Sequence, residues 1–536
     1  MRKKTSTAPK NTTKSVNGSV IKIFFILVVL LFNGSCKKSE ETTEQKLLSG
    51  NADIIKSAID DIWRLNKTEY LVNLADILSN KEVREHAAFA LSLMASDTVD
   101  LLVLNKMNAA YDKTGHYVYF QLRRRKKPEM QGNVKNYLKY DEQNVDSSFV
   151  YWFLNDEYEK AAELFNKTET LNLIKKEFLV AIGNKKEKKL MNFLRSIKDV
   201  EFMPMAKWAM NNIDPRHVIK TDFKDKTIIY NPYWVKYEKN PVLPTVEGTF
   251  KSVHTANPDI LVENRMIYFY YRGGDGNDRI AVATSSYDYF DGKNFSDYPK
   301  NPVISIGRDA FDDLAVLDPA AVYFNKKVFL YYSGLGKGDD AIGLAVSDNF
   351  YDFTKYKNNP VLTGRAPEVV LKDGVIYLYY VLPNERTGYS IYLATSRDGY
   401  DFQKFSSSPV FSFGGYDDWD SKTVTTPKIR EINGVYYMFY AGDNEFTDYP
   451  PFFGLAFSYD LINWHRSKQN PVFSRGKKGQ WDDGGIWFAE VFPYKTKLYM
   501  YYEGWGGGQS HEKEYGPGGH SQIGMAESKF KPEDML

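Results

Sequence analysis

Cysteine is nearly absent from this chain of 536 residues, since Cys36 is the only one. The sequence therefore has no disulfide framework and no thiolate metal site. Neither sign of charge dominates, with 70 Lys and Arg against 68 Asp and Glu, so no global field favours nucleic acid. No two histidines have metal-ligand spacing, and no Gly-rich phosphate motif of the G-x-x-x-x-G-K-S type occurs. We accordingly expect no metal, no cofactor and no nucleic-acid partner.

Long apolar runs are also lacking, except at residues 20–32, where only Lys22 interrupts the run. This stretch follows a basic segment and is marginal in length for crossing a bilayer. It ends in Asn33-Gly34-Ser35-Cys36, and the pattern is typical of a signal peptide. The segment resembles a bacterial lipoprotein signal, which implies that Cys36 is lipidated. An uncleaved anchor is the alternative, and both interpretations export the protein.

The resemblance divides the amino-terminal region. Residues 1–36 are the expected lipoprotein signal peptide. The polar, acidic residues 37–46 resemble the tether of surface lipoproteins of Bacteroidetes. We therefore expect an outer-membrane lipoprotein at the cell surface or on the periplasmic face, held through its lipid anchor.

Residues 47–214 show helical periodicity. Ile55, Ile59 and Trp63 fall on one helix face, and KEVREHAAFALSLM has the small and apolar stripe of an α-solenoid helix. No catalytic constellation stands out here. We predict an all-α, helical-repeat-like domain that supports or presents the rest of the chain, followed by a linker at residues 215–239.

A repeated unit organises the remaining residues. Each copy opens with a proline or its counterpart, and an aromatic residue followed by tyrosine comes twelve residues later. The opening positions are Pro258, Pro319, Pro367, Pro427 and Ala489. An Asn-Pro-Val type segment and a strand-like segment such as IGLAVS also recur, so each copy supplies about four strands. Units of this size that cannot bury their own faces predict a mainly β, five-bladed β-propeller at residues 240–530.

The pattern of opening proline, tyrosine-rich strand, IGLAxS strand and Asn-Pro-Val segment resembles the five-bladed propeller glycosidases. These form the superfamily of glycoside hydrolase families 43, 32, 68, 117 and 130. The resemblance covers about residues 240–530 and implies activity on a sugar. Asn257-Pro258, together with Tyr271-Arg272-Gly273, is most similar to family 130, which includes phosphorylases as well as hydrolases.

The innermost strand of each blade lines the channel, and side chains along a strand alternate in direction. The residues just before and just after the opening proline are therefore predicted to share one face. These pairs are Asn257 and Asp259, Asp318 and Ala320, Ala366 and Glu368, Thr426 and Lys428, and Phe488 and Glu490. Carboxylates from four blades would then converge, and glycoside hydrolysis needs one protonated and one charged carboxyl group.

The resemblance assigns roles to three of these carboxylates. It implies a base or nucleophile in blade one, a second Asp that tunes the pKa, and a Glu acid. Asp318, in Leu-Asp-Pro, matches the second Asp. The other two positions before the proline hold Asn257 and Ala366, whereas Asp259 and Glu368 follow the proline. We predict Glu368 as proton donor, Asp259 as base and Asp318 as the modulator of the pKa.

Further residues are candidates for binding the sugar. Asn257 and Glu490 belong to the predicted channel face. Trp481 offers a ring for stacking, although its repeated aromatic-Asp motif favours a structural turn. His254 lies three residues before Asn257, and His520 ends a glycine-rich insertion that is expected to fold over the channel mouth.

These observations predict a glycoside hydrolase that acts on plant or algal oligosaccharides. A phosphorylase similar to family 130 is one alternative, for which Arg272, Arg365, Lys428 and His520 could supply the cationic cluster. A non-catalytic, carbohydrate-binding surface lipoprotein is the other, favoured by the displaced acids. The sequence does not decide between exo and endo cleavage or fix the oligomeric state.

Overall fold

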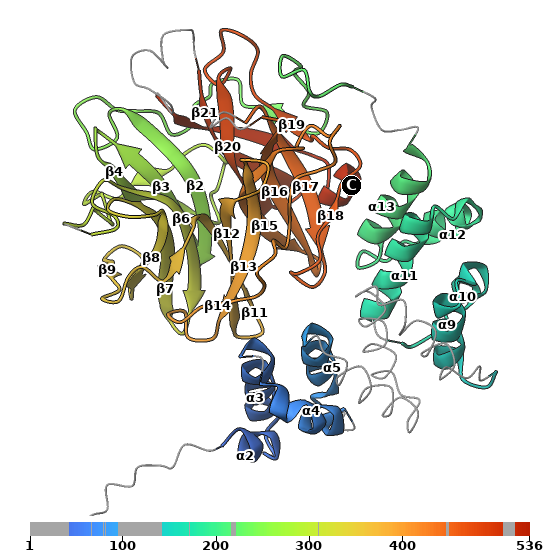
Figure 1. Ribbon diagram of the computed structural model, residues 1–536. Helices are drawn as coiled ribbons and strands as arrows, with labels where there is room; N and C mark the ends of the chain where they lie inside the picture. The colour runs from blue at the N-terminus through green and yellow to red at the C-terminus, as the bar shows by residue number, and fades with distance from the viewer. Residues whose placement is uncertain are drawn as a thin grey trace, which may run out of the picture.

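The computed structural model describes residues 42–94 and 142–536, with gaps at 66, 79, 81, 171, 216–220, 309, 446–449 and 507–519. Helices come first along the chain and strands follow (Figure 1). A mainly β protein with a helical amino-terminal region is therefore confirmed. Cys36, the rest of the predicted signal peptide and residues 37–41 lie outside the described residues. Among the helices of the described ranges, none has the length and apolar character needed to cross a membrane.

The helical region is made of short helices. The α-helices are α2 (Thr43–Leu47), α3 (Ala52–Arg64), α4 (Leu71–Ile77), α5 (Arg84–Leu93), α9 (Val145–Leu154), α10 (Tyr158–Leu164), α11 (Asn172–Lys185), α12 (Met191–Ser196) and α13 (Met203–Ile213). Short 3₁₀ helices are η1 (Thr68–Tyr70), η2 (Lys188–Leu190) and η4 (Pro532–Met535). Helix α2 begins with a capping box between Thr42 and Gln45. Residues 43–46, the last four of the segment predicted as a tether, therefore belong to a helix.

The strands form five similar units. Unit 1 contains β2 (His254–Glu263), β3 (Met266–Gly274), β4 (Asp278–Ser286) and β5 (Ser296–Asp297). Unit 2 contains β6 (Ala315–Phe324), β7 (Lys327–Leu335), β8 (Ala341–Ser347), β9 (Thr354–Lys355) and β10 (Leu362–Thr363). Unit 3 contains β11 (Arg365–Lys372), β12 (Val375–Pro383), β13 (Tyr389–Ser396) and β14 (Gln403–Lys404). Unit 4 contains β15 (Thr423–Ile432), β16 (Val435–Asp443), β17 (Phe452–Ser458), β18 (His465–Arg466) and β19 (Phe473–Ser474). Unit 5 contains β20 (Gly485–Tyr494), β21 (Lys497–Trp505), β22 (Gln522–Ser528) and, from earlier in the chain, β1 (Val235–Lys236).

Within each unit the first three strands are antiparallel neighbours. Two-residue turns join the first two strands; in units 1 to 4 both turn residues have positive φ, as at Asn264-Arg265 and Asn433-Gly434, and in unit 5 only Lys495 does. Such turns match the right-handed twist of a hairpin and favour Asn and Gly. The first strands of the units touch one another in the cyclic order β2, β6, β11, β15, β20 and back to β2. In the described residues the units do not merge into one closed sheet; a single parallel pairing, Asp278 with Ala315, joins units 1 and 2.

The segment before unit 1 completes unit 5. Strand β1 pairs with β22, so part of the predicted linker at residues 215–239 belongs to the sheet. Asn240 exchanges hydrogen bonds with the backbone of Met525 in β22, just as Asn359 does with Leu344 within unit 2. The Asn-Pro-Val segment therefore fixes the third strand of a unit, and the copy at Asn240 serves the last unit.

The repeated aromatic-Asp motif is structural, as its regular offset suggested. In unit 5 the Tyr502 hydroxyl donates to Asp482 at 3.0 Å, and the ring of Trp481 packs on Tyr502 at 5.6 Å between centroids. Tyr332 with Asp312 and Tyr440 with Asp420 repeat this contact at 2.9 Å.

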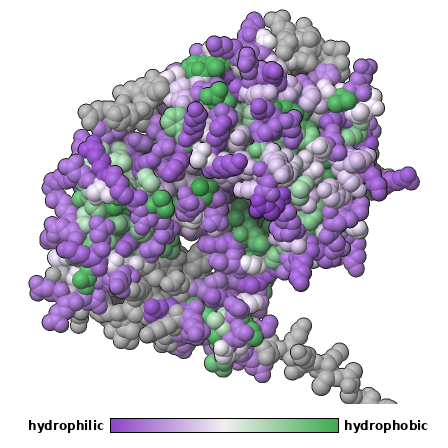
Figure 2. Space-filling model, turned by 180° about the vertical axis from the view of Figure 1, so that it is seen from behind, coloured by the Kyte–Doolittle hydropathy of each residue, from purple (hydrophilic) through white to green (hydrophobic). Residues whose placement is uncertain are grey.

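The helices dock on units 3 and 4. The Trp208 indole donates to the carbonyl oxygen of Arg466 at 2.8 Å, and its ring packs edge-on against Phe457 at 6.0 Å. Asp60, which is buried, forms an ion pair with Arg397. One apolar core is continuous from the helices into units 4 and 5. Hydrophilic side chains cover most of the described face shown in Figure 2, as expected when the apolar residues pack between helices and strands.

Candidate active site

A β-bulge interrupts the first strand of every unit at the opening proline. In unit 1, Ala256 pairs with Arg272 but Asp259 pairs with Tyr270, so the inner strand carries one extra residue. The residue before the proline or its counterpart has a left-handed backbone in all five units, with φ of 49° at Asn257 and 53° at Asp318. The others are Ala366, Thr426 and Phe488. A bulge breaks the alternation of a strand. Asn257 and Asp259 both bond to the backbone of β6, but of these two only Asn257, the residue before the proline, lines the pocket.

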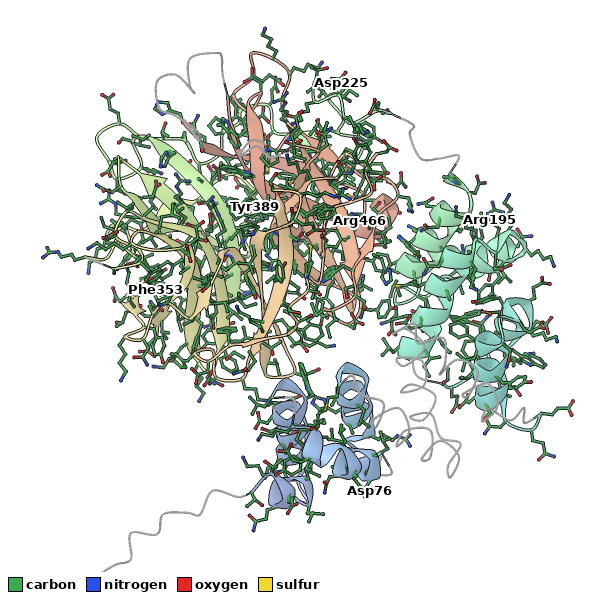
Figure 3. The ribbon with its side chains drawn as sticks, viewed as in Figure 1. Asp76, Arg195, Asp225, Phe353, Tyr389 and Arg466 are labelled. Carbon is green, nitrogen blue, oxygen red and sulfur yellow. The ribbon has the colours of Figure 1, made fainter. Side chains whose placement is uncertain are left out.

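The residues before the proline line a pocket where the five first strands meet. The lining residues are Asn257, Arg272, Leu317, Asp318, Arg365, Ala366, Tyr389, Thr423, Thr425, Thr426, Trp487 and Phe488. They come from the first four residues of the inner strands, from the end of β3 and from the start of β13. All therefore lie at one end of the β region. Tyr389 marks this site in Figure 3.

One buried carboxylate, Asp318, lines this pocket, and a second, Glu503, lies behind the lining residue Asn257. The Asn257 amide links them: its nitrogen donates to Glu503 Oε2 at 2.8 Å, and its oxygen accepts from the Asp318 backbone N–H at 3.3 Å. One oxygen of each carboxylate, Asp318 Oδ2 and Glu503 Oε1, is buried without a hydrogen-bond partner among the described residues. Burial raises the pKa of Asp318, and it raises the pKa of Glu503 to about 7. Glu503 can therefore hold or release a proton near neutral pH.

Arg272 lies between these carboxylates and an ion-pair cluster. Its guanidinium bonds Asp278 at 2.8 Å and His254 at 3.2 Å, while His254 also bonds Asp278. Burial opposes the charge on Arg272, but Asp278 and Glu503 outweigh it and raise its pKa. Burial likewise opposes the charge on Asp278, yet Arg272 and His254 hold its pKa below the usual range. Arg272 thus lies on the pocket wall, with His254 behind it.

Another part of the pocket wall carries Arg365 and aromatic rings. Arg365 lies 3.6 Å from Asp340 and 5.9 Å from the Tyr389 ring centroid. Trp487 packs against Trp505 with 4.7 Å between ring centroids. The wall therefore offers a cation and two aromatic side chains, Tyr389 and Trp487, to a bound molecule.

The residues after the proline form a separate buried cluster, further along the inner strands. Lys428 Nζ lies 2.7 Å from Asp259 and 3.2 Å from Glu368, and Arg430 pairs with Glu490. Strand β6 takes part through its backbone: the Ala321 N–H donates to Asp259 at 2.9 Å, and the Pro319 oxygen accepts from Lys428 at 3.3 Å. The cluster therefore ties all five first strands together.

Burial dominates the protonation of this cluster. It raises the pKa of Glu368, and it raises the pKa of Glu490 to about 8. Burial disfavours the charge on Lys428, but Asp259 and Glu368 outweigh it and raise its pKa. All four side chains are buried and none lines the pocket. The expectation that these four residues border the channel mouth is therefore corrected.

The remaining candidates lie at other places. His520 donates from Nδ1 to the Val253 carbonyl oxygen at 2.8 Å, beside His254 but not among the pocket-lining residues. Trp481 packs on Tyr502 and does not line the pocket. Within the described part of the chain, no group of three or more His, Cys, Asp or Glu side chains has the geometry of a metal site.

Glu503 is the main residue that the sequence analysis missed. It stands two residues after the Tyr501 aromatic position, at the offset of Arg272 in unit 1. Aligning second strands rather than first strands would have found it. Tyr389 and Trp487 carried no signal that separated them from the many structural aromatics.

Two known proteins and several solved structures are similar to part of this chain. No family model matches the sequence. Uncharacterized protein Rv1502 of Mycobacterium tuberculosis (strain ATCC 25618 / H37Rv) is 25% identical over 289 residues, covering 50% of this chain and 93% of that protein. Uncharacterized protein MT1551 of the CDC 1551 / Oshkosh strain matches with the same identity and coverage.

Solved glycoside hydrolases are among the similar structures. One comes from the GH130 family of mannoside phosphorylases, which contains hydrolases of β-1,2 mannosidic linkages in Candida mannan. It has a TM-score of 0.43 and 21% identity, and the match covers 58% of this chain and 96% of that chain. A putative glycoside hydrolase from Bacteroides ovatus ATCC 8483 has a TM-score of 0.42 and 20% identity, covering 56% and 98%. A thermostable family-43 glycoside hydrolase has a TM-score of 0.41 and 19% identity, covering 52% and 91%.

Proposed function

We propose that this chain cleaves glycosidic bonds of an oligosaccharide in the pocket, with Asp318 and Glu503 as the catalytic carboxylates. The observation that carries the proposal is the pair itself. Asp318 lines the pocket, and Glu503 lies directly behind the lining residue Asn257. Both carboxyl groups are buried with raised pKa values, and each has an oxygen without a partner among the described residues. Hydrolysis of a glycoside requires one carboxyl group that donates a proton and another that stays charged.

The two carboxylates differ in their surroundings. Arg272 and Arg365 both favour the charged form of Asp318, which suits it to activate water or to stabilise positive charge on the sugar. Glu503 has a pKa of about 7, which suits it to protonate the leaving oxygen. The rings of Trp487 and Tyr389 supply faces on which a sugar can stack.

The five units are, in this proposal, the blades of a propeller. Their first strands contact one another in a closed cycle. Strand β1, which precedes unit 1 in the sequence, pairs with β22 and so completes unit 5. Such closure leaves only short, protected edges. A central pocket with side chains from every blade follows from this arrangement.

A phosphorylase is the second candidate, because two arginines, Arg272 and Arg365, line the same pocket. A non-catalytic sugar-binding protein is the third, since Asn257 and Ala366 stand where the propeller glycosidases place acids. Both alternatives would use the same pocket as the hydrolase, and they differ in what happens to the bound sugar.

We also propose that the protein is exported and anchored to the outer membrane through a lipid on Cys36, as the sequence pattern indicates. Mass spectrometry of the protein from bacterial membranes tests this directly. A diacylated amino-terminal Cys36 is expected; an unmodified Cys36 would contradict the anchor.

The proposed activity is tested with a panel of nitrophenyl glycosides and plant and algal oligosaccharides, run with and without phosphate. Wild type is compared with Asp318→Asn and with Asp401→Asn, a matched change at an exposed position. Turnover without phosphate that Asp318→Asn abolishes supports hydrolysis. Release of a glycosyl phosphate identifies a phosphorylase, and binding without any turnover would leave only the sugar-binding function.

A further inference from the structure

The pocket and the helical region lie at opposite ends of the strands. The pocket takes residues from the starts of the inner strands, the end of β3 and the start of β13. The helices contact the other end. Arg397 directly follows β13 and pairs with Asp60 of α3. His86 of α5 borders one cavity with Lys372 and Asp373, at the turn that closes β11 and β12.

The attachment of the helices to this end is buried. Asp60 is 2% exposed and accepts from the Trp63 indole at 2.9 Å while it pairs with Arg397. The Trp63 ring packs edge-on against Phe405 at 6.4 Å, beside β14. Buried polar and aromatic contacts of this kind fix the orientation of two packed regions. The helical region is therefore held against the far end of the strands.

The amino terminus of the described chain leaves from the side of the helices that faces away from the strands. Figure 1 shows α2 below α3, with α3 between α2 and the strands. Figure 3 shows Tyr389 of the pocket in the upper part of the strands and Asp76 of α4 at the bottom of the molecule. Cys36 and Thr43 are only seven positions apart, so an extended chain between them spans at most about 25 Å.

We propose that the helical region is a pedestal that lies between the membrane and the strands and turns the pocket away from the membrane. This inference rests on the proposed lipid anchor at Cys36. A pocket in this orientation takes oligosaccharides that arrive from the surrounding medium. It does not reach the sugar headgroups of the lipids in the membrane that carries the protein.

Energy transfer to a membrane dye measures this orientation. Lipidation occupies the only native cysteine, so a second cysteine can be labelled selectively. Leu314→Cys places a donor at the pocket end, where Leu314 is 68% exposed, and Leu48→Cys places one beside α2, where Leu48 is 86% exposed. In vesicles containing an acceptor lipid, transfer from Leu48→Cys is expected to be several-fold greater. Equal transfer from both sites, or stronger transfer from Leu314→Cys, would overturn the pedestal.

A second version of the experiment tests the orientation independently of the lipid anchor and of the proposed glycosidase activity. The same two variants, without residues 1–36 and with the native cysteine therefore removed, carry an amino-terminal histidine tag and bind vesicles of nickel-chelating lipid. The same order of transfer is expected there. Failure of only the native protein to bind vesicles would overturn the lipid anchor, while the tagged arm decides the orientation. Neither readout uses turnover, so a protein without glycosidase activity can still pass or fail this test.

Discussion

Burial sets the protonation of the carboxyl groups in this protein. Asp318 lines the pocket and Glu503 is held by the lining residue Asn257, whereas Asp259, Glu368 and Glu490 lie in the cluster around Lys428. Cations compensate both groups, but the pocket pair keeps free oxygens. An oxygen without a partner leaves a carboxyl group able to give or take a proton, whereas oxygens of the cluster around Lys428 are held in ion pairs. Residue chemistry alone therefore does not identify the acids; their position relative to the bulge does.

Glu503→Gln is expected to lower kcat/KM by about 10²–10⁴, because the amide cannot donate the proton that the leaving group requires. Steady-state kinetics on any substrate found in the glycoside panel measures this change. Glu431→Gln, an exposed change of the same kind on β15, should leave the rate unaltered. Wild-type turnover by Glu503→Gln would remove this residue from the mechanism.

Protein stability should fall as pH rises from about 5 to 8, in part because of Glu490. Burial raises the pKa of this group from an ordinary 4.5 to about 8 in the folded protein. Between these values the folded state binds more protons than the unfolded state, so the free energy of unfolding decreases with rising pH. Urea unfolding at several pH values should show a flatter dependence for Glu490→Gln than for wild type. An unchanged slope would mean that Glu490 is ionised in the folded state throughout this range.

At the scale of elements, the bulge decides which side chains reach the pocket. Ala366 has φ of 49°, a conformation that costs an L-residue roughly 1–2 kcal/mol and glycine very little. Ala366→Gly should therefore be less destabilising than Ala320→Gly by about 1–2 kcal/mol. Ala320 is the matched control, because it is buried on an inner strand without a positive φ. Chemical unfolding of both variants measures the difference, and equal losses would contradict a strained bulge.

The charged cluster around Lys428 is the second feature at the scale of elements, since it joins the five inner strands. Lys428→Met leaves Asp259 and Glu368 buried without their cation, and breaking a buried pair in this way costs about 3–5 kcal/mol. Thermal unfolding of Lys428→Met should show a marked loss, whereas Lys404→Met, at an exposed position on β14, should resemble wild type. A Lys428→Met protein as stable as wild type would show that the strands need no such tie.

Much of the β region was predictable at this scale. The twelve-residue offset between proline and aromatic predicted the hairpins, and the small-residue segments predicted the third strands. Which side chains line the pocket was not predictable, because one extra residue in each inner strand breaks the simple alternation that the prediction assumed. A residue before proline normally avoids helical backbone angles, so nothing in the sequence announced the left-handed conformation at Asn257 or Ala366.

At the scale of the whole molecule, the cyclic contact of the inner strands brings distant residues into one site. Glu503 and Asn257 are 246 positions apart along the chain and share a hydrogen bond. The sequence predicted a helical amino-terminal region, but the docking of its helices on units 3 and 4 depends on contacts such as Trp208 with Phe457. Contacts between separate regions leave no periodic signal, so they could not be predicted.

A crystal structure of Glu503→Gln with a bound oligosaccharide tests the central claim most directly, because the substitution should slow turnover and retain the ligand. The account predicts a glycosidic oxygen within hydrogen-bonding distance of the side chain at position 503, with Asp318 on the same sugar and a ring stacked on Trp487 or Tyr389. A sugar bound away from this pocket, or one that contacts Glu368 and Asp259 instead, would contradict it.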